Sequence, residues 1–177
     1  MTGATFFVAQ HGASLTASNL SFANAGYVLI SNSSAYSTNH ASTSNAAYIS
    51  VYNGGTLTVG GNYTIANTGG FLITGKDSYM KSTGSMLVTG PGATITVSDG
   101  GTLHAVHSLR LDAHGANISI ENGGTVISQL RFYGSRNADQ TVISSITLKD
   151  GGKFETNGTS WLSGQAEGTS MFIFEQT

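Results

Sequence analysis

The 177-residue sequence contains no cysteine and one proline, and only 9% of its residues are Asp, Glu, Lys or Arg. Without cysteine, neither a disulfide framework nor a thiolate metal site can form. An ordinary soluble domain carries roughly 25% charged residues, so this surface must be polar but largely uncharged. The net charge of −2 gives no electrostatic reason to expect nucleic acid or an anionic membrane as a partner.

Long apolar runs are also missing. No stretch approaches the roughly 18 apolar residues of a membrane-spanning helix, so we expect no direct membrane insertion by this segment. The opening MTGATFFVAQ lacks the charged region and the long apolar run of a signal peptide. If the protein is exported, we expect its targeting and anchoring parts to lie outside this chain.

What the chain does have is a recurring phrase of Asn or Asp followed by two glycines. An apolar residue stands four positions before each copy, at Ile49, Ile95, Ile118 and Ile146. Weaker copies align at Phe7, Val28, Leu72 and Phe172. Successive anchors then lie 21 to 28 residues apart, which predicts seven full copies and the opening of an eighth.

Each copy alternates apolar and polar residues in the manner of short strands. The slot two positions after the anchor is filled by Ala9, Ile30, Val51, Thr74, Val97, Ile120 and Leu148. The slot eight positions after the anchor is filled by Leu15, Tyr36, Leu57, Met80, Leu103, Val126 and Phe154. A third apolar patch follows in most copies, and no window keeps a 3.6-residue period, so each copy is expected to hold three strands and no helix.

A repeat of 20 to 50 residues indicates a stacked array. The predicted fold class is all-β: a single-stranded parallel β-helix (β-solenoid) with three short strands per coil and about seven to eight coils. The usual handedness of parallel connections makes it right-handed. We expect residues 1–177 to form one such domain, as a fragment or repeat segment of a longer protein, with a loop insertion near 133–144.

The repeated phrase is expected to form a corner of the coil. Asn and Asp tolerate a left-handed backbone and bond their own chain two residues on, and Gly takes positive φ without a steric penalty. Stacked Asn side chains can also hydrogen-bond in a column. The predicted structural turn column consists of Asn32, Asn53, Asp99, Asn122 and Asp150.

One group of residues in and beside the insertion is a candidate for partner binding. It comprises Arg131, Tyr133, Arg136 and Asp139. Arg and Tyr are enriched in interfaces, so this loop could contact a partner; the alternative is an ordinary solvated loop.

Two further groups of residues are candidate chemical sites. Asp99 and Asp150 share a slot two coils apart, about twice 4.8 Å, which is close to the carboxyl separation of roughly 6.5–9.5 Å in an inverting glycosidase. Asn fills the same slot in other coils, so we expect no catalytic residue. His104, His107 and His114 could supply zinc ligands, but the strand alternation does not make them converge. We therefore expect no metal and no cofactor.

The repeats resemble those of a known family. The segments NGGTLTVGGNYTIANTGG, GATITVSDGGTLHA and GANISIENGGTVIS are similar to passenger segments of bacterial autotransporters and related large surface adhesins. The resemblance implies an extracellular location on the bacterial cell surface and a role in adhesion or self-association rather than catalysis. The implied partners are the chain itself, or surface glycans and proteins.

Two other functions remain open from the sequence. The first-side patterns FFVA at 6–9 and FIF at 172–174 are alike, so the last coil of one copy could stack on the first coil of another and propagate a filament. The other is a carbohydrate-active β-helix of the tailspike or polysaccharide-lyase type, for which Asp99 and Asp150 would be the carboxylates.

Overall fold

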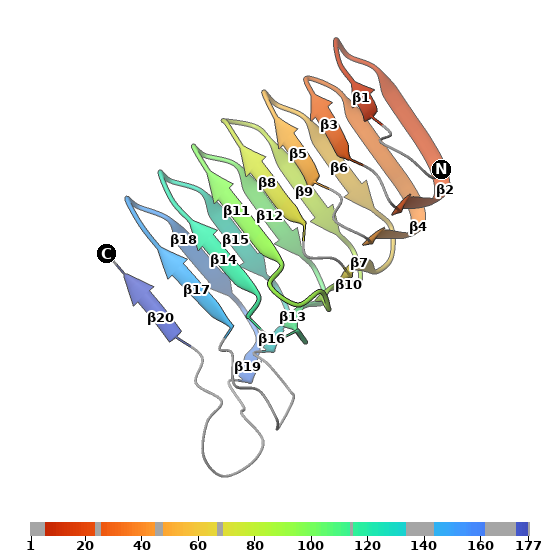
Figure 1. The fold of residues 1–177 in the computed structure, drawn as a ribbon. Coiled ribbons are helices and arrows are strands. Elements are labelled where there is room, and N and C mark those ends of the chain that lie inside the picture. Colours follow the sequence, from red (N-terminus) through yellow and green to blue (C-terminus); the bar gives the residue numbers. More distant parts are fainter. Residues whose placement is uncertain are drawn as a thin grey trace.

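A computed structural model of the chain describes residues 6–23, 26–44, 48–66, 69–113, 115–133, 144–161 and 173–176. Within these residues the chain winds into a stack of coils (Figure 1). Every strand pairing joins neighbouring coils and is parallel. The predicted all-β parallel β-solenoid with three strands per coil is thus confirmed. Among the described residues no helix is long and apolar enough to span a membrane.

The first side of the solenoid is an eight-stranded sheet whose strands follow one another in chain order. It contains β1 (Phe6–Ala9), β3 (Tyr27–Ser31), β5 (Tyr48–Tyr52), β8 (Gly70–Thr74), β11 (Thr94–Ser98), β14 (Asn117–Ile120), β17 (Ser145–Leu148) and β20 (Ile173–Gln176).

The second and third sides belong to one twelve-stranded sheet. The two sides are continuous because β2 (Ser14–Ala23) and β4 (Ser34–Ser44) are long strands that each run along both sides. The first half of β4 pairs with β6 on the second side, and its second half pairs with β7 on the third side. The later strands of the second side are β6 (Thr56–Val59), β9 (Tyr79–Ser82), β12 (Thr102–Ala105), β15 (Thr125–Ser128) and β18 (Lys153–Thr156). Those of the third side are β7 (Tyr63–Ala66), β10 (Ser85–Val88), β13 (Ser108–Leu111), β16 (Arg131–Tyr133) and β19 (Thr159–Trp161).

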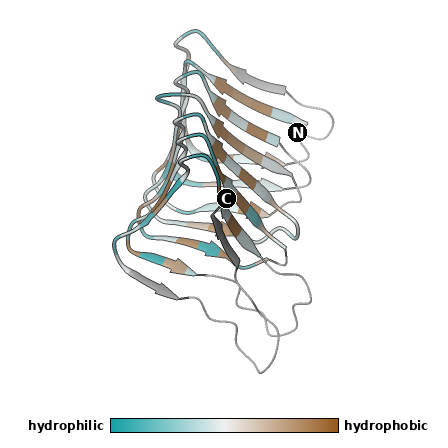
Figure 2. Cartoon of the chain, turned by 90° about the vertical axis from the view of Figure 1, so that its left-hand side faces the viewer, coloured by the Kyte–Doolittle hydropathy of each residue, from teal (hydrophilic) through white to brown (hydrophobic). Residues whose placement is uncertain are grey.

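The core consists of columns of equivalent apolar side chains from successive coils. On the first side the anchor column contains the buried residues Val28, Ile49, Phe71, Ile95, Ile118 and Ile146. Burying one such side chain contributes about 1.5–3 kcal/mol. The hydrophobic residues lie in the strands, whereas the turns joining the first and second sides are hydrophilic (Figure 2).

The register corrects several slots that the sequence pattern assigned. In the fourth coil Phe71 pairs with Ile49 and Ile95, so it holds the anchor position predicted for Leu72. The next inward residue is accordingly Ile73 and not Thr74. The segment FLIT at 71–74 has apolar residues on both faces of the strand, so the alternation of apolar and polar residues cannot fix its register against the neighbouring strands. A shift of one residue would exchange the inward and outward faces.

Two more predicted slots are wrong by one or two positions. In the second coil the buried residue is Ala35, while the predicted Tyr36 is 40% exposed. Tyr36 is the larger apolar side chain, but the pairing of Ala35 with Leu57 places the small residue inward. In the last coil Ile146 pairs with Phe174, so Phe174 holds the anchor position; the predicted Phe172 lies outside the described residues.

The corner between the first and second sides explains why the phrase contains two glycines. In the sixth coil Asn122 and Gly123 have φ of 49° and 72°, so both adopt the left-handed backbone that favours Asn and Gly. Gly124 has a different constraint, because a Cβ there would lie 2.2 Å from the carbonyl oxygen of Val97 in the preceding coil. The second glycine is required by the closeness of neighbouring coils, and the first by its backbone angle.

We predict that Gly124→Ala destabilises the solenoid more than Gly123→Ala. A left-handed alanine costs about 1–2 kcal/mol, whereas the methyl group at position 124 must separate two coils or distort the corner, which we expect to exceed about 2 kcal/mol. Urea unfolding followed by circular dichroism measures both.

The control for that comparison is Gly26→Ala, since a Cβ at Gly26 meets nothing within 4 Å and the residue has no positive φ. This variant should unfold like the parent. If Gly124→Ala also unfolded like the parent, the account of the corner would be wrong.

Among the described residues Tyr63 is the largest fully buried side chain. Its ring packs edge-to-face on Phe71, with centroids 5.7 Å apart. Burial raises the pKa of the Tyr63 phenol far above its ordinary value of 10.0, and the hydroxyl of Thr43 opposes this only partly. The folded state therefore keeps this phenol protonated under conditions in which the unfolded chain ionises it.

We predict an alkaline loss of stability that Tyr63→Phe reduces. Below pH 10 the Tyr63 phenol keeps its proton in both the folded and the unfolded chain, so the free energy of unfolding does not change. Above pH 10 only the unfolded chain releases this proton, so the free energy of unfolding falls by about 1.4 kcal/mol per pH unit. Urea unfolding at about pH 8 and pH 11 should show a smaller loss for Tyr63→Phe than for the parent, by about 1 kcal/mol. Tyr36→Phe, which removes an exposed hydroxyl, should leave the loss intact, and an equal effect of both variants would contradict the assignment.

Candidate functional site

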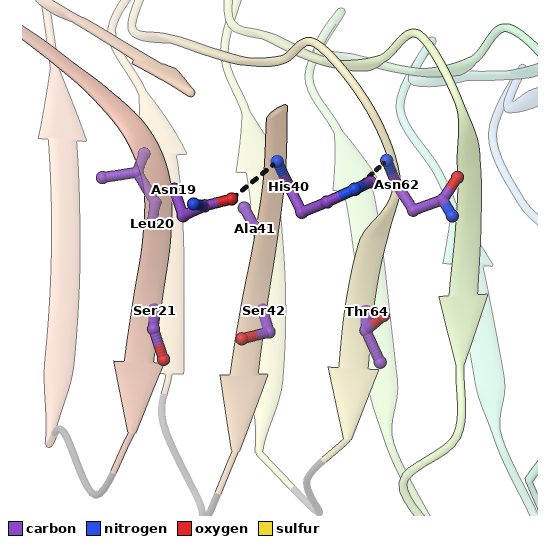
Figure 3. Close-up of a pocket in the computed structure, with 8 residues that line it drawn as sticks. All are labelled: Asn19, Leu20, Ser21, His40, Ala41, Ser42, Asn62 and Thr64. Carbon is purple, nitrogen blue, oxygen red and sulfur yellow. Dashed lines mark hydrogen bonds between the residues drawn. The ribbon is translucent and has the colours of Figure 1, made fainter. Parts of the chain in front are cut away.

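The outer face of the third side carries a shallow trough across β2, β4 and β7 (Figure 3). Its volume is about 410 Å³, and it is lined by Asn19, Leu20, Ser21, His40, Ala41, Ser42, Asn62 and Thr64. Leu20 and Ala41 are buried in the core, so the polar groups that line the trough are amide, imidazole and hydroxyl groups. Carbon atoms make up the rest of its surface. None of the eight lining residues is Asp, Glu, Lys or Arg.

The polar residues of the trough form two parallel rows (Figure 3). The rim row contains Asn19, His40 and Asn62, at the corner where the third side begins; the floor row contains Ser21, Ser42 and Thr64, two residues further along each strand. Strand geometry places neighbours within a row about 4.8 Å apart and the two rows about 6.6 Å apart. Both rows run along the axis of the solenoid because they cross stacked strands.

A ladder of hydrogen bonds fixes the rim row. The backbone N–H of His40 donates to Asn19 Oδ1 at 3.3 Å, and the backbone N–H of Asn62 donates to His40 Nδ1 at 3.1 Å. The backbone N–H of Ser85 continues the ladder by donating to Asn62 Oδ1 at 2.8 Å. Each side chain thus accepts a hydrogen bond from the backbone of the next coil.

This ladder also sets which atoms are presented outward. The amide oxygens of Asn19 and Asn62 are engaged with backbone, which leaves their Nδ2 groups as donors. The ring of His40 accepts at Nδ1, so its proton is on Nε2. The rim row therefore presents a line of N–H donors above a line of hydroxyl groups that both donate and accept.

Glycines of the next coil make room for the rim side chains. A Cβ at Gly84 would lie 2.4 Å from Asn62 Oδ1, and a Cβ at Gly61 would lie 2.8 Å from His40 Nδ1. His40 and Asn62 therefore lie directly against the backbone of the coil that follows them. The sequence signal for this arrangement is a glycine one coil after His40 and another one coil after Asn62.

Buried serines hold the same corner from the inside. Ser37 Oγ lies 2.8 Å from the carbonyl oxygen of His40, and Ser82 Oγ lies 2.7 Å from that of Gly61. Ser128, like Ser37, bonds the carbonyl oxygen three residues further along the chain, that of Arg131. The sequence reasoning missed these residues, although each serine follows two positions after an inward strand residue.

The structure places all five residues of the predicted turn column at the corner between the first and second sides. Their backbones are left-handed, with φ of 43° at Asn32, 49° at Asn53, 53° at Asp99, 49° at Asn122 and 48° at Asp150. The fourth coil has a different corner, in which Gly75 and Asp77 have positive φ.

The side chains of this column bond mainly to hydroxyl groups. Asn53 Nδ2 donates to Ser31 Oγ of the preceding coil at 3.4 Å. Asp99 Oδ2 accepts from Thr74 Oγ1 at 2.8 Å and from Ser98 Oγ at 3.1 Å. These bonds from Thr74 and Ser98, with a further one from Asn122, lower the pKa of the Asp99 carboxyl below its ordinary value.

The lowered pKa of Asp99 bears on the carboxylate pair weighed for catalysis. A general acid needs a raised pKa, and the hydrogen bonds of Asp99 act in the opposite direction. Asp150 occupies the equivalent turn two coils away. The carbohydrate-cleaving role stays a prediction, in which Asp99 would serve as the base rather than the proton donor.

Two of the four predicted partner-binding residues fall within the described chain. Arg131 and Tyr133 lie on β16, where Arg131 Nη1 donates to the Tyr133 hydroxyl at 3.4 Å. Arg136 and Asp139 lie outside the described residues.

Pairing of β13 with β16 brings Arg110 beside Tyr133, with its guanidinium 5.6 Å from the ring centroid and 2.9 Å from Asp112. The sequence reasoning missed the contact of Arg110 with Tyr133 because it depends on the register between coils.

The histidines weighed as zinc ligands have separate partners. His104 Nδ1 lies 2.8 Å from the Tyr79 hydroxyl, and its Nε2 lies 3.1 Å from Gln129 Oε1. His107 Nδ1 lies 3.2 Å from Ser85 Oγ, and His114 is outside the described residues. In the part of the chain that the structure describes, no group of three or more metal-ligating side chains comes together.

Comparison with known proteins leaves the chain without an assigned relative: no family model, no curated protein and no solved structure matches it.

We predict that Thr74→Val raises the pKa of the Asp99 carboxyl toward its ordinary value, because Thr74 is the strongest contributor to its lowering. The carboxyl carbon of Asp99 can be titrated by NMR in both proteins. Thr96→Val, at an outward position of the neighbouring strand β11, should leave the titration unchanged. An unaltered Asp99 titration in Thr74→Val would contradict the hydrogen-bond account.

Proposed function

We propose that the chain is an extracellular structural and adhesive β-solenoid of a bacterial surface protein, similar to an autotransporter passenger, and that it mediates adhesion or self-association. The observation that carries the proposal is the repetition of uncharged polar groups along an outer side. Ser21, Ser42 and Thr64 occupy equivalent positions in successive coils, as do Thr96, Ser119 and Thr147 on the first side.

Such repetition suits adhesion for a physical reason. One hydrogen bond to a hydroxyl group has a small net free energy, about 0.5–1.5 kcal/mol. Several equivalent groups on one rigid frame can act together, so that linked weak contacts give a much stronger attachment. A stacked solenoid supplies that frame because each coil holds the next in register.

The partners that fit this surface are other copies of the chain, or surface glycans and proteins. The low charge content favours contacts that depend on hydrogen bonding and shape. Adhesion of this kind should be nearly independent of ionic strength, because salt screens only interactions between charges.

We predict that beads coated with the purified chain aggregate with one another or attach to a mucin-coated surface. Attachment should change less than about twofold between about 50 mM and 500 mM salt. Beads coated with the heat-unfolded chain serve as the control, because they carry the same composition without the ordered rows.

Coated beads that stay dispersed and do not attach more than the control would contradict the adhesive role. Electron microscopy of the concentrated protein adds a second readout. Long unbranched filaments would favour the alternative in which copies stack end to end through their first and last coils.

A further inference from the structure

We infer that the trough on the third side is a binding site for a neutral linear saccharide whose chain runs along the solenoid axis across β2, β4 and β7. The inference rests on the adhesive function proposed above, and it adds the ligand class and the residues that contact it.

Charge selects against an ionic ligand at this site. The eight lining residues include no Asp, Glu, Lys or Arg. A charged group entering the trough would lose part of its hydration without meeting an opposite charge. The nearest cation on the same outer row is Arg110, two coils beyond Thr64, where it is already paired with Asp112.

The backbone selects against an extended peptide. A peptide strand binds a sheet by adding to an unpaired edge. Here β4 is paired on both sides, with β2 and β7, and β7 is paired in turn with β10. The other lining strand, β2, pairs only with β4 among the described residues, so its second edge faces along the axis at the end of the stack. The trough lies on the outer face and runs across the strands, so a ligand lying in it meets side chains rather than that edge.

An apolar ligand is disfavoured as well. It would cover the hydroxyl groups of Ser21, Ser42 and Thr64 and the outward N–H groups of the rim row. A polar group buried without a hydrogen-bond partner costs more than a typical hydrogen bond contributes. A saccharide avoids this cost because its hydroxyl and ring oxygens can accept from the rim row while its hydroxyls exchange bonds with the floor row.

The hydrogen bonding of His40 differs from that of His104 on the second side. Both ring nitrogens of His104 are engaged, by Tyr79 and Gln129. In the described contacts of His40 the backbone of Asn62 occupies Nδ1, and the side chain is exposed. The Nε2–H of His40 is therefore oriented by the ladder and available to a ligand, as are the amide N–H groups of Asn19 and Asn62.

The repeat of the rows also fits a polymer. Each coil offers one donor on the rim and one hydroxyl on the floor, with about 4.8 Å between coils. A linear saccharide offers a similar set of oxygens with each successive sugar, so several sugars can be bound in the same way.

The test is an NMR titration of the whole chain with neutral hexasaccharides, one of β-1,4-linked glucose and one of β-1,4-linked N-acetylglucosamine. At millimolar concentration at least one should shift the side-chain amide signals of Asn19 and Asn62 and the ring signals of His40. Hexagalacturonate, which is linear but anionic, should bind more weakly. The inference is overturned if neither neutral sugar shifts these signals, or if the anionic sugar binds more tightly.

Variants of the floor row test whether the hydroxyls contact the ligand. The triple variant Ser21→Ala, Ser42→Ala, Thr64→Val should weaken saccharide binding by about tenfold or more, because three hydrogen-bonding groups are removed. The matched control is Thr96→Val, Ser119→Ala, Thr147→Val, an equivalent outward row on the first side, which should change binding less than about twofold. Equal binding by the two triple variants would overturn the inference.

Variants of His40 test the rim row. His40→Asn supplies the same acceptor and donor as Asn19 and Asn62, so it should retain saccharide binding. His40→Ala removes both and leaves the backbone N–H of Asn62 without its partner, so binding should fall severalfold. Equal binding by His40→Ala and His40→Asn would show that the rim row does not contact the sugar.

Two outcomes separate this inference from the proposed function. If beads coated with the floor-row triple variant adhere as well as the parent, adhesion stands and the saccharide site is wrong. If the parent binds hexasaccharide but its beads do not adhere, the site stands and the adhesive function is wrong. A third outcome is that the NMR signals of the trough residues shift with protein concentration when no sugar is present. That result would show that the trough is a contact between copies of the chain, and it would overturn the saccharide assignment.

Discussion

The parallel hydrogen bonds between neighbouring coils set a spacing of about 4.8 Å that every other feature must fit. They bring the carbonyl oxygen of Val97 so close to the next coil that position 124 has no room for a Cβ. They likewise place the side chain of Asn62 against Gly84. The repeated glycines are therefore a direct consequence of this spacing, and the apolar columns fill the interior that it leaves.

The same spacing turns a polar surface into an ordered one. Exposed Asn and His side chains usually sample several rotamers, but in the rim row each accepts a backbone hydrogen bond from the coil above. The buried serines hold the backbone of this corner from below. An uncharged outer surface can in this way present donors in fixed directions, which is the property that recognition of a neutral partner requires.

The sequence was sufficient for the fold and insufficient for the site. Repeat length and apolar alternation predict three strands per coil, because every coil must bury the same slots. They fail at Leu72 and Tyr36, where both faces carry apolar residues and the register is decided by neighbouring coils. The trough was missed for a different reason. Asn19, His40 and Asn62 follow the spacing of the repeat, but they stand in a stretch rich in Asn, Ser and Thr. Only the pairing of β2, β4 and β7 shows which of these polar residues form a row.

Fold and surface cannot vary independently in such a molecule. His40 orients the backbone of the next coil and also exposes its Nε2–H, so its substitution affects both the ladder and the outer surface. The residues free to change are those of the floor row, because Ser42 and Thr64 point away from the core, and the contacts described for them are the backbone pairings of their strands. Specificity for one saccharide over another would accordingly be set at the floor row, while the rim row is held by the requirements of stacking. The ladder is thus the feature that links the stability of the solenoid to what its third side can bind.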